Sequence, residues 1–507
     1  MPKIIKLTLL CICGLLFFLS CKPFDAIVIG TPIIKAGTAK ITGRITSKND
    51  VNKDSIYVNI FVPHPITGEV VQYKALADRS GKFSIDVDVE TNISLIGLYT
   101  SLKPYKSLLI KLTSGGVTNV DVAYDSNFGF EKINITPTGM TQNDMKRGLE
   151  VIGEMIELKP NKAPEPLYNK NPNEFLDQAK ASVLRRLELL NKDSLISKEF
   201  KGILSKDFRI WIYNVHAFDY EAAMRLNYRN VSQDRFNEPV IKKVDRSYYR
   251  FLKDFNLNDP QYLICSSFWE FQKTILQNEI IGLPEIGESD IPSWLAKVKV
   301  VLSDLVGFKD GQYYDVLAAN AYGRQLNEEV KPLSEKQKTN IAAYWKKGEI
   351  AKILLRKNQQ VVELDKFKSP VVVNDISSVP DDKVMETIVA KHKGKVVFID
   401  LWATWCGPCL DAMKQFGSAK GEFHDKAVAF VYLTNASSPR KLWEEKIKGI
   451  GSEHYYLKDT QWEYIMNHFG LEYIPSYLLY NKEGVFINKV SAFPGNEKVK
   501  AMINGLL

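Results

Sequence analysis

Residues Val396–Cys409 read VVFIDLWATWCGPC and carry the strongest structural signal in the chain. This stretch begins with a short apolar run, Val396–Leu401, which is typical of a buried strand and is interrupted only by Asp400. Two cysteines follow in the order Cys406-Gly407-Pro408-Cys409, directly before a predicted helix that runs to about Ala419. The sequence therefore predicts a strand, a turn and a helix with a cysteine at its start.

Short strands and helices alternate on both sides of this stretch. Such alternation predicts an α/β domain over residues 363–507, with a central mixed sheet, helices on both faces and an antiparallel hairpin near the end. The other predicted strands are Val371–Asn374, Val428–Leu433, Ser476–Tyr480 and Val485–Val490, and the other predicted helices are Asp381–Lys393, Pro439–Lys448, Gln461–His468 and Glu497–Leu506.

The spacing of the two cysteines predicts a reactive dithiol. Cys406 falls at a helix N-terminus, where unpaired backbone N–H groups and the helix dipole favour a thiolate. Cys409 lies one helical turn further on, close enough to form a disulfide with Cys406, and Pro408 costs no hydrogen bond in the first turn. In such a pair Cys406 attacks a substrate disulfide and Cys409 resolves the mixed disulfide.

The residues Phe398–Cys409, together with Ile474-Pro475 downstream, closely resemble the thioredoxin superfamily. With a long N-terminal extension, the chain is similar to the TlpA/ResA-like thiol–disulfide oxidoreductases of the bacterial envelope. The resemblance implies that Asp400 accepts the proton of Cys409, and burial would raise the pKa of such a carboxyl. A partly exposed Asp at a strand end is the alternative.

The resemblance also assigns a substrate-binding surface. Pro475 occupies the position of a cis-proline that faces the active site, and the backbone of Ile474 would pair with an extended substrate segment. Trp405 would shield the disulfide and contact the substrate, whereas Trp402 is expected to pack inside. Related proteins often carry Glu where this chain has Ala412, so no second acid–base group is expected there.

The N-terminal residues resemble the signal of a bacterial lipoprotein. Lys3 and Lys6 precede the apolar run Leu7–Leu19, which is shorter than the roughly 20 residues that a transmembrane helix needs. Ser20-Cys21 then resembles a lipobox, so we expect a signal peptide at 1–20, a lipidated Cys21 and a linker at 21–36. An ordinary signal peptide or an uncleaved anchor are the alternatives. The expected location is the envelope, facing the periplasm, at either membrane.

Composition narrows the class of protein further. With 507 residues, 45% hydrophobic and 25% charged, the chain predicts several soluble domains and not a polytopic membrane protein. Only 6 cysteines are present, too few for a disulfide scaffold of this length. The net charge of +8 without a dense basic run, together with export, gives no reason to expect nucleic acid as a partner.

The residues between the linker and the α/β domain divide into three parts. We expect an antiparallel β-sandwich at 37–130, an irregular connector at 131–172 and a mostly α-helical region at 173–362. The aromatic side chains of the helical region suggest a ligand groove or, as the favoured interpretation, an ordinary core. The predicted strands are Ala39–Thr46, Ser55–Phe61, Glu69–Ala75, Lys82–Val89, Ser94–Thr100, Ser107–Thr113 and Val117–Ala123, and the helices are Gln142–Leu158, one capped by Asn173, Ser197–Leu226, Tyr248–Leu252, Tyr262–Ile280, Ile291–Leu305, Tyr313–Asn327 and Ser334–Lys357.

These patterns favour an anchored disulfide reductase that acts on exported proteins and draws electrons from a membrane donor. Apart from the Cys406–Cys409 disulfide, no cofactor is expected, and no metal, because no second half of a zinc site accompanies the cysteine pair. One alternative is a binding protein whose N-terminal domains hold a single client and whose redox domain serves that complex alone. A peroxidase is disfavoured, since no matching signature surrounds a lone cysteine.

Overall fold

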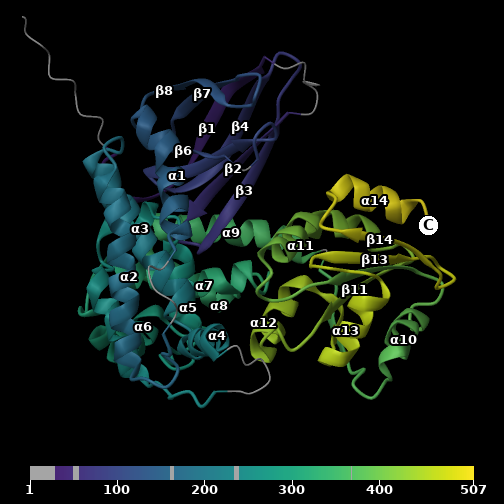
Figure 1. The fold of residues 1–507 in the computed structure, drawn as a ribbon. Coiled ribbons are helices and arrows are strands. Elements are labelled where there is room, and N and C mark those ends of the chain that lie inside the picture. The colour runs from purple at the N-terminus through teal and green to yellow at the C-terminus, as the bar shows by residue number, and fades with distance from the viewer. Residues whose placement is uncertain (1–28, 49–55, 105, 160–164, 233–238, 367) are drawn as a thin grey trace, which may run out of the picture.

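The computed structural model describes residues 29–48, 56–104, 106–159, 165–232, 239–366 and 368–507 (Figure 1). The predicted signal peptide, 1–20, and the predicted lipidation site, Cys21, lie outside these ranges. None of the helices within the ranges combines the length and the apolar character that crossing a membrane requires.

The N-terminal part contains two sheets, with strand orders β4-β1-β7-β8 and β3-β2-β5-β6. Over the described residues every strand pair in them is antiparallel except β1–β7, which is parallel, so the predicted antiparallel arrangement holds for the other pairs. Side chains from both sheets enter one apolar core. The strands are β1 (Ile34–Ser47), β2 (Tyr57–His64), β3 (Glu69–Leu76), β4 (Lys82–Thr91), β5 (Ile93–Thr100), β6 (Leu108–Thr113), β7 (Val117–Tyr124) and β8 (Phe130–Thr136).

The strand β8 corrects the expectation of an irregular connector from residue 131. It pairs antiparallel with β7 and buries Ile133 and Ile135, while Glu131 and Lys132 face solvent. With only two inward apolar side chains, this segment gives a weak alternating signal in the sequence. Backbone pairing with β7 therefore stabilises β8 where its own side chains contribute little.

The region that follows is helical, as predicted, with differences at helix ends. The cap of the first long helix is Asn171 and not Asn173, because the Asn171 side chain accepts the backbone N–H of Asn173 and Pro172 opens the helix. The predicted helix Ser334–Lys357 is broken at Lys346, whose φ is 52°. The elements are α1 (Gln142–Glu157), α2 (Pro172–Lys192), α3 (Lys198–His216), α4 (Tyr220–Ser232), η2 (Arg246–Phe255), η3 (Pro260–Ile264), α5 (Phe268–Gln277), α6 (Ile291–Val306), α7 (Gln312–Asn327), α8 (Glu335–Trp345) and α9 (Glu349–Asp365).

Two further predicted helices of this region were too long. Ser197–Leu226 divides into α3 and α4, and Tyr262–Ile280 into η3 and α5. Aromatic rings such as Tyr248, Tyr249 and Phe271 are buried and pack edge-to-face in the core, so the interpretation as core holds for them.

The turn between β2 and β3 joins the sheets to the helices. The Asn320 side chain of α7 donates to the carbonyls of Pro65 and Ile66 at 2.7 and 3.1 Å, and Asn327 donates to Thr67 at 2.7 Å. The core of the sheets continues into that of the helices without a break. The β2–β3 turn is therefore fixed in position beside α7.

The C-terminal domain has the predicted mixed sheet, with strand order β14-β13-β10-β11-β12-β9. Side chains of α11, α12 and α14 pack on one face, and those of α10 and α13 on the other. The strand β12 was not predicted, because its sequence SEHYY is mostly polar. The elements are β9 (Val371–Asn374), η4 (Asp381–Lys383), α10 (Val384–Ala390), β10 (Val396–Leu401), α11 (Gly407–Lys420), η5 (Gly421–Phe423), β11 (Val428–Thr434), α12 (Arg440–Ile450), β12 (Ser452–Tyr456), α13 (Asp459–His468), β13 (Ser476–Tyr480), β14 (Phe486–Ser491) and α14 (Asn496–Asn504).

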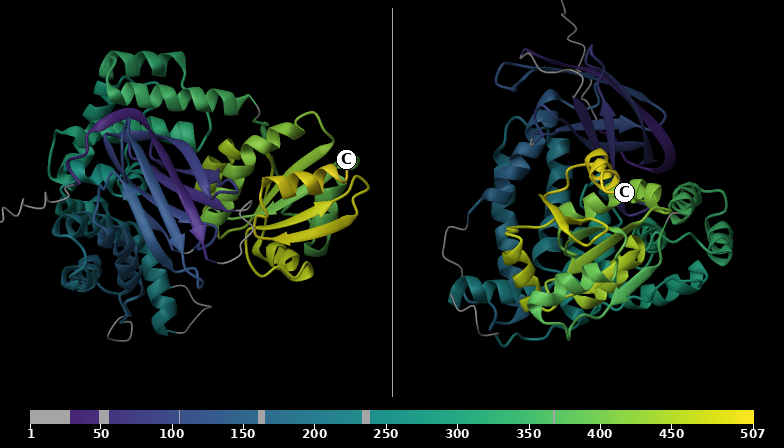
Figure 2. Two further views of the ribbon diagram at one scale, coloured as in Figure 1. Left: turned by 90° about the horizontal axis from the view of Figure 1, so that it is seen from above. Right: turned by 90° about the vertical axis from the view of Figure 1, so that its right-hand side faces the viewer.

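The C-terminal domain lies against both preceding regions, with α11 and α12 at the contact (Figures 1 and 2). Arg324 of α7 pairs with Glu445 of α12 at 3.4 Å, and Lys441 pairs with Glu279 at 2.7 Å. A Cβ on Gly449 would lie 2.0 Å from the carbonyl oxygen of Glu328, so the two backbones touch closely there. The active-site helix thus faces the N-terminal regions and not open solvent alone.

Candidate active site

The two cysteines of the motif form a disulfide at the start of α11. Their Cα atoms are 5.3 Å apart, and both side chains are buried. The backbone N–H of Cys409 donates to Sγ of Cys406 at 3.2 Å. This donor and the N-terminal end of the helix dipole would stabilise a thiolate at Cys406, as the sequence predicts. Gly407 and Pro408, between the cysteines, are exposed and open the helix.

Asp400 lies inside the sheet beneath the motif, so the alternative of an exposed strand-end residue is excluded. It is 4% exposed, and it pairs in register with Tyr432 of β11 and Tyr477 of β13. Its Oδ1 has no hydrogen-bond partner among the described residues. Burial raises the pKa of Asp400 well above its usual range, and only Lys420 opposes the rise.

Lys420, at the end of α11, is the charged group that sequence reasoning missed. Its Nζ donates to the Tyr432 hydroxyl at 3.3 Å and to the Ile450 carbonyl at 3.0 Å. Burial lowers the pKa of Lys420 to about 7, while the charge of Asp400 opposes the fall. No motif marks this lysine, because its charge acts on Asp400 only once α11 has packed across the sheet.

The loop that carries the motif is held by the segment after β11. Ser438 accepts the backbone N–H of Thr404 at 3.0 Å and shares a bond with the Thr434 hydroxyl at 2.8 Å. The indole N–H of Trp405 donates to Ser437 at 3.2 Å, while the ring is 64% exposed. The two serines are the second group that the sequence did not reveal.

The predicted packing and contact roles of the two tryptophans agree with their positions. Trp402 is fully buried, and Trp405 presents its ring to solvent beside the disulfide. The Ile474–Pro475 bond is cis, as the resemblance implied. Pro475 precedes Ser476, which pairs with Leu401 at the end of β10, so the proline lies at the same edge of the sheet as the motif. Ala412 is buried and offers no acid–base group.

A cavity of about 860 Å³ lies next to the motif, between the C-terminal domain and the N-terminal regions. On the C-terminal side it is lined by Thr404, Trp405, Gly407 and the face of α11 that follows. On the other side it is lined by the start of β3 and by parts of α5 and α7. The motif therefore opens onto a space that three parts of the chain enclose.

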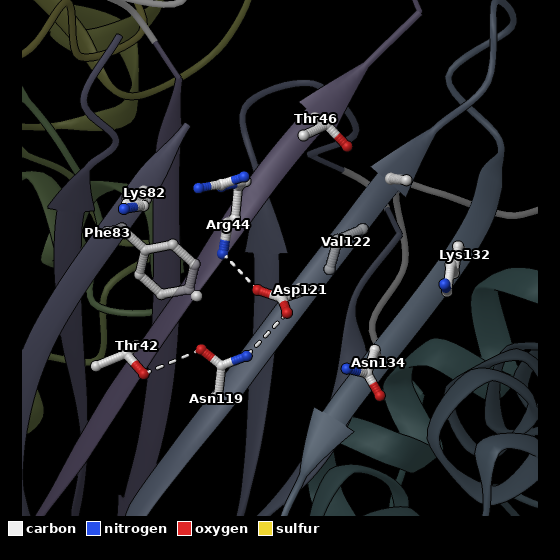
Figure 3. A pocket seen from close by; sticks show the side chains of 12 residues that line it. Thr42, Arg44, Thr46, Lys82, Phe83, Asn119, Asp121, Val122, Lys132 and Asn134 are labelled. Carbon is white, nitrogen blue, oxygen red and sulfur yellow. Dashed lines mark hydrogen bonds between the residues drawn. The ribbon is translucent and has the colours of Figure 1, made fainter. Parts of the chain in front are cut away.

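A second hollow, of about 520 Å³, lies on the outer face of β1 and β7 (Figure 3). Thr42 donates to Asn119 at 3.2 Å, and Asn119 donates to Asp121 at 2.9 Å (Figure 3). These hydrogen bonds satisfy the side chains of Thr42, Asn119 and Asp121 within the hollow. The lining of the hollow includes no residue of the C-terminal domain, so the hollow is separate from the disulfide.

Outside the motif, the described residues offer one further thiol and no cluster of metal ligands. In the described part of the chain, no group of three or more His, Cys, Asp or Glu side chains could hold a metal ion. Cys265 is free and buried, and burial raises the pKa of its thiol well above its usual range. It is thus a small core residue, as the sequence suggested.

Comparison with known proteins agrees with this geometry. Residues 394–486 match the family model described as thioredoxin-like. The chain therefore contains a thioredoxin-like domain at these residues. No curated protein shows a significant match to the chain.

Three solved structures each resemble about a quarter of the chain. StoA from Bacillus subtilis is 23% identical, over 22% of this chain and 83% of that one, with a TM-score of 0.19. The thioredoxin domain of a thiol-disulfide oxidoreductase from Bacteroides vulgatus is 18% identical, over 23% and 84%, with a TM-score of 0.21. A thiol:disulfide interchange protein of the thioredoxin family from Chlorobium tepidum is 16% identical, over 27% and 96%, with a TM-score of 0.22.

Proposed function

We propose that this protein is a membrane-anchored thiol–disulfide oxidoreductase that reduces disulfides of exported proteins through Cys406 and Cys409. The observation that carries the proposal is the disulfide at the start of α11, together with the buried carboxyl of Asp400 on β10, the strand that leads into the motif. A nucleophilic thiol, a resolving thiol and a proton acceptor are the groups that disulfide exchange requires.

The reaction transfers two electrons from the dithiol to the client. The Cys406 thiolate attacks a client disulfide, which forms a mixed disulfide and releases one client thiolate. Asp400 takes the proton of the Cys409 thiol, and the resulting thiolate attacks Sγ of Cys406. The second client thiolate leaves, and the Cys406–Cys409 disulfide re-forms. A membrane electron donor then returns the disulfide to the dithiol.

The substrate surface and the anchor complete the proposal. Trp405, Ile474 and Pro475 contact the client, with Gly407 and Pro408 shaping the loop between the cysteines. A lipid on Cys21 holds the protein at the envelope with its domains in the periplasm. The apolar run Leu7–Leu19 and the Ser20-Cys21 pair support this location. We further propose that the two N-terminal sheets form a β-sandwich that acts as a docking module.

The reduction potential of the Cys406–Cys409 pair tests the direction of the reaction. A reductase requires a value near that of thioredoxin, about −270 mV, and a strong oxidase a value near −120 mV. Equilibration of the purified chain with glutathione buffers, read by thiol labelling, measures it. A value at the oxidising end would reject the reductase and leave an oxidase or isomerase.

A client-specific protein is the second candidate, and the contact between the domains favours it. The motif faces a cavity that the N-terminal regions help to build, which would restrict the clients that reach Cys406. Trapping with Cys409→Ser distinguishes the two candidates, because this variant cannot resolve the mixed disulfide. A single trapped partner, identified by mass spectrometry, supports the specific protein, and many partners support the general reductase.

A further inference from the structure

The cavity beside the motif carries an excess of positive charge. Its walls include seven Lys or Arg side chains and four Glu or Asp side chains. The basic residues are Lys273, Arg324, Lys357, Lys368, Lys414, Lys420 and Lys446, and the acidic residues are Glu69, Glu270, Glu328 and Asp411.

Two of the acidic groups are already bound by more than one cation. Glu69 pairs with Lys357 and, at 2.9 Å, with Lys414. Glu328 pairs with Lys273 and, at 3.9 Å, with Arg324. A carboxylate that two cations share neutralises only one of them. Arg324 also pairs with Glu445 at 3.4 Å and Lys368 with Asp365 at 3.6 Å, so within the part of the chain that the structure describes the cations of the walls without a carboxylate of their own are Lys414, Lys420 and Lys446.

Lys446 of α12 adds to this excess. It is half-buried, and among the described residues its ammonium has no carboxylate within 4 Å and no hydrogen-bond acceptor. The charges of Glu328, Glu445 and Glu270 act on Lys446, and the first two of these carboxylates also lie within 4 Å of Arg324. Burial, together with the charge of Lys273, lowers the pKa of Lys446 to about 8. A partly desolvated ammonium of this kind gains from an incoming anion.

The cavity lies beside the loop that carries the reacting thiol. Thr404, Trp405 and Gly407 form its end nearest the motif, and Lys414 lies further along the same helix. Lys446 lies on α12, and the rings of Trp269 and Trp405 provide apolar contact. A volume of about 860 Å³ accommodates several amino-acid residues in extended form and exceeds what a single small anion would fill.

We propose that this cavity binds an extended, acidic segment of the client polypeptide that flanks the cysteine attacked by Cys406. The client carboxylates pair with Lys414 and Lys446, and its apolar side chains contact Trp269 and Trp405. This inference rests on the proposed function and adds to it the substrate class. The position of the motif beside this cavity then favours clients that carry an acidic segment next to the reactive cysteine.

Binding of redox-inactive peptides to the full chain tests the inference apart from the chemistry. Three fluorescein-labelled ten-residue peptides carry Ser at the reactive position and flanks rich in Asp and Glu, in Asn and Gln, or in Lys. Fluorescence anisotropy should give the acidic peptide at least a fivefold lower Kd than the neutral one, and added salt should remove the difference. Equal affinity for the acidic and neutral peptides overturns the proposal.

Matched lysine variants locate the site. Lys446→Gln and Lys414→Gln should each raise the Kd of the acidic peptide about three- to tenfold. Lys446→Arg should bind that peptide as the wild type does. Lys448→Gln is the control, because Lys448 lies on the same helix, is exposed and does not line the cavity. An equal loss of affinity for the acidic peptide in Lys448→Gln and Lys446→Gln would overturn the assignment of the binding site to the cavity. Circular dichroism confirms that each variant is folded.

Reduction of a neutral peptide disulfide separates this inference from the proposed function. Lys446→Gln should lose the preference for an acidic over a neutral peptide disulfide, whereas Lys448→Gln should reduce both substrates at the wild-type rates. If the wild-type chain reduces neither substrate, the proposed function fails, whereas the anisotropy result still decides whether the cavity binds acidic peptides.

Discussion

Lys414 of the active-site helix and Glu69 at the start of β3 are 345 positions apart in the chain and pair at 2.9 Å. Glu69 is buried and also binds Lys357 of α9. One carboxylate thus connects the redox domain, the N-terminal sheets and the helical region. The position of the motif relative to its cavity depends on this junction.

Replacement of Glu69 should weaken the junction. Burial opposes the ionisation of Glu69, but the charges of Lys357 and Lys414 outweigh it and lower the pKa to about 2. The stability that this carboxylate contributes is therefore full above its unfolded pKa and is lost as the pH falls toward 2. We expect Glu69→Gln to cost about 3 kcal/mol at pH 7, as for a broken buried pair, and much less at pH 2.

Urea unfolding at both pH values measures this loss. Glu131→Gln serves as the control, because Glu131 pairs with Lys48 at the surface and should change stability little. A loss that is equal at pH 7 and pH 2 would contradict the ionic origin of the effect.

Asp400→Asn should slow the release of the client while stabilising the fold. Without the carboxylate, Cys409 loses its proton acceptor, and we expect turnover to fall about 100-fold. Because the folded pKa of Asp400 is raised, the native state loses stability as the pH rises above the unfolded value, and Asn removes this loss. The variant should therefore be more stable than the wild type at pH 8 and similar to it at pH 3.

Stopped-flow kinetics of a fluorescent disulfide substrate measure the release step, and thermal unfolding measures the stability. Asp425→Asn is the control, since the Asp425 side chain is 98% exposed. An unchanged release rate in Asp400→Asn would remove Asp400 from the reaction.

Lys420→Met should shift the pH dependence of client release to higher pH. The charge of Lys420 favours the ionised form of Asp400, so its loss raises the pKa of Asp400 further. Since Asp400 must be ionised to accept a proton, the release rate should reach half its maximum at a higher pH. Lys426→Met, which removes an exposed lysine close by, should leave the profile in place. A shift toward lower pH would show that Lys420 does not act through Asp400.

Ser438→Ala should loosen the loop that carries the motif. The change leaves the buried N–H of Thr404 without its acceptor, which costs about 1–2 kcal/mol. We expect faster alkylation of reduced Cys406 by iodoacetamide and a lower unfolding midpoint in urea. Ser437→Ala loses two exposed bonds, to Trp405 and to Asn435, and should preserve the midpoint. Equal effects of the two substitutions would exclude a specific role for Ser438.

Local sequence predicted much of the C-terminal domain. The strands β10 and β13 have the predicted bounds, because short apolar runs bounded by polar residues specify buried strands directly. The strands β8 and β12 were missed, because each has few apolar side chains and depends on an existing neighbour for its hydrogen bonds. Lys346, with its positive φ, ended a helix whose apolar periodicity continued beyond it.

The sequence by itself determined the dithiol motif, the buried strand beneath it and the position of Asp400 within that strand. These features are local, since a spacing of a few residues fixes what a strand and a helix start place together. The tertiary structure was needed to show that the charge of Lys420 acts on Asp400, that Ser438 holds the motif loop and that Glu69 pairs with Lys414. Those interactions join residues from separate elements, and their positions follow from how the helices and sheets pack.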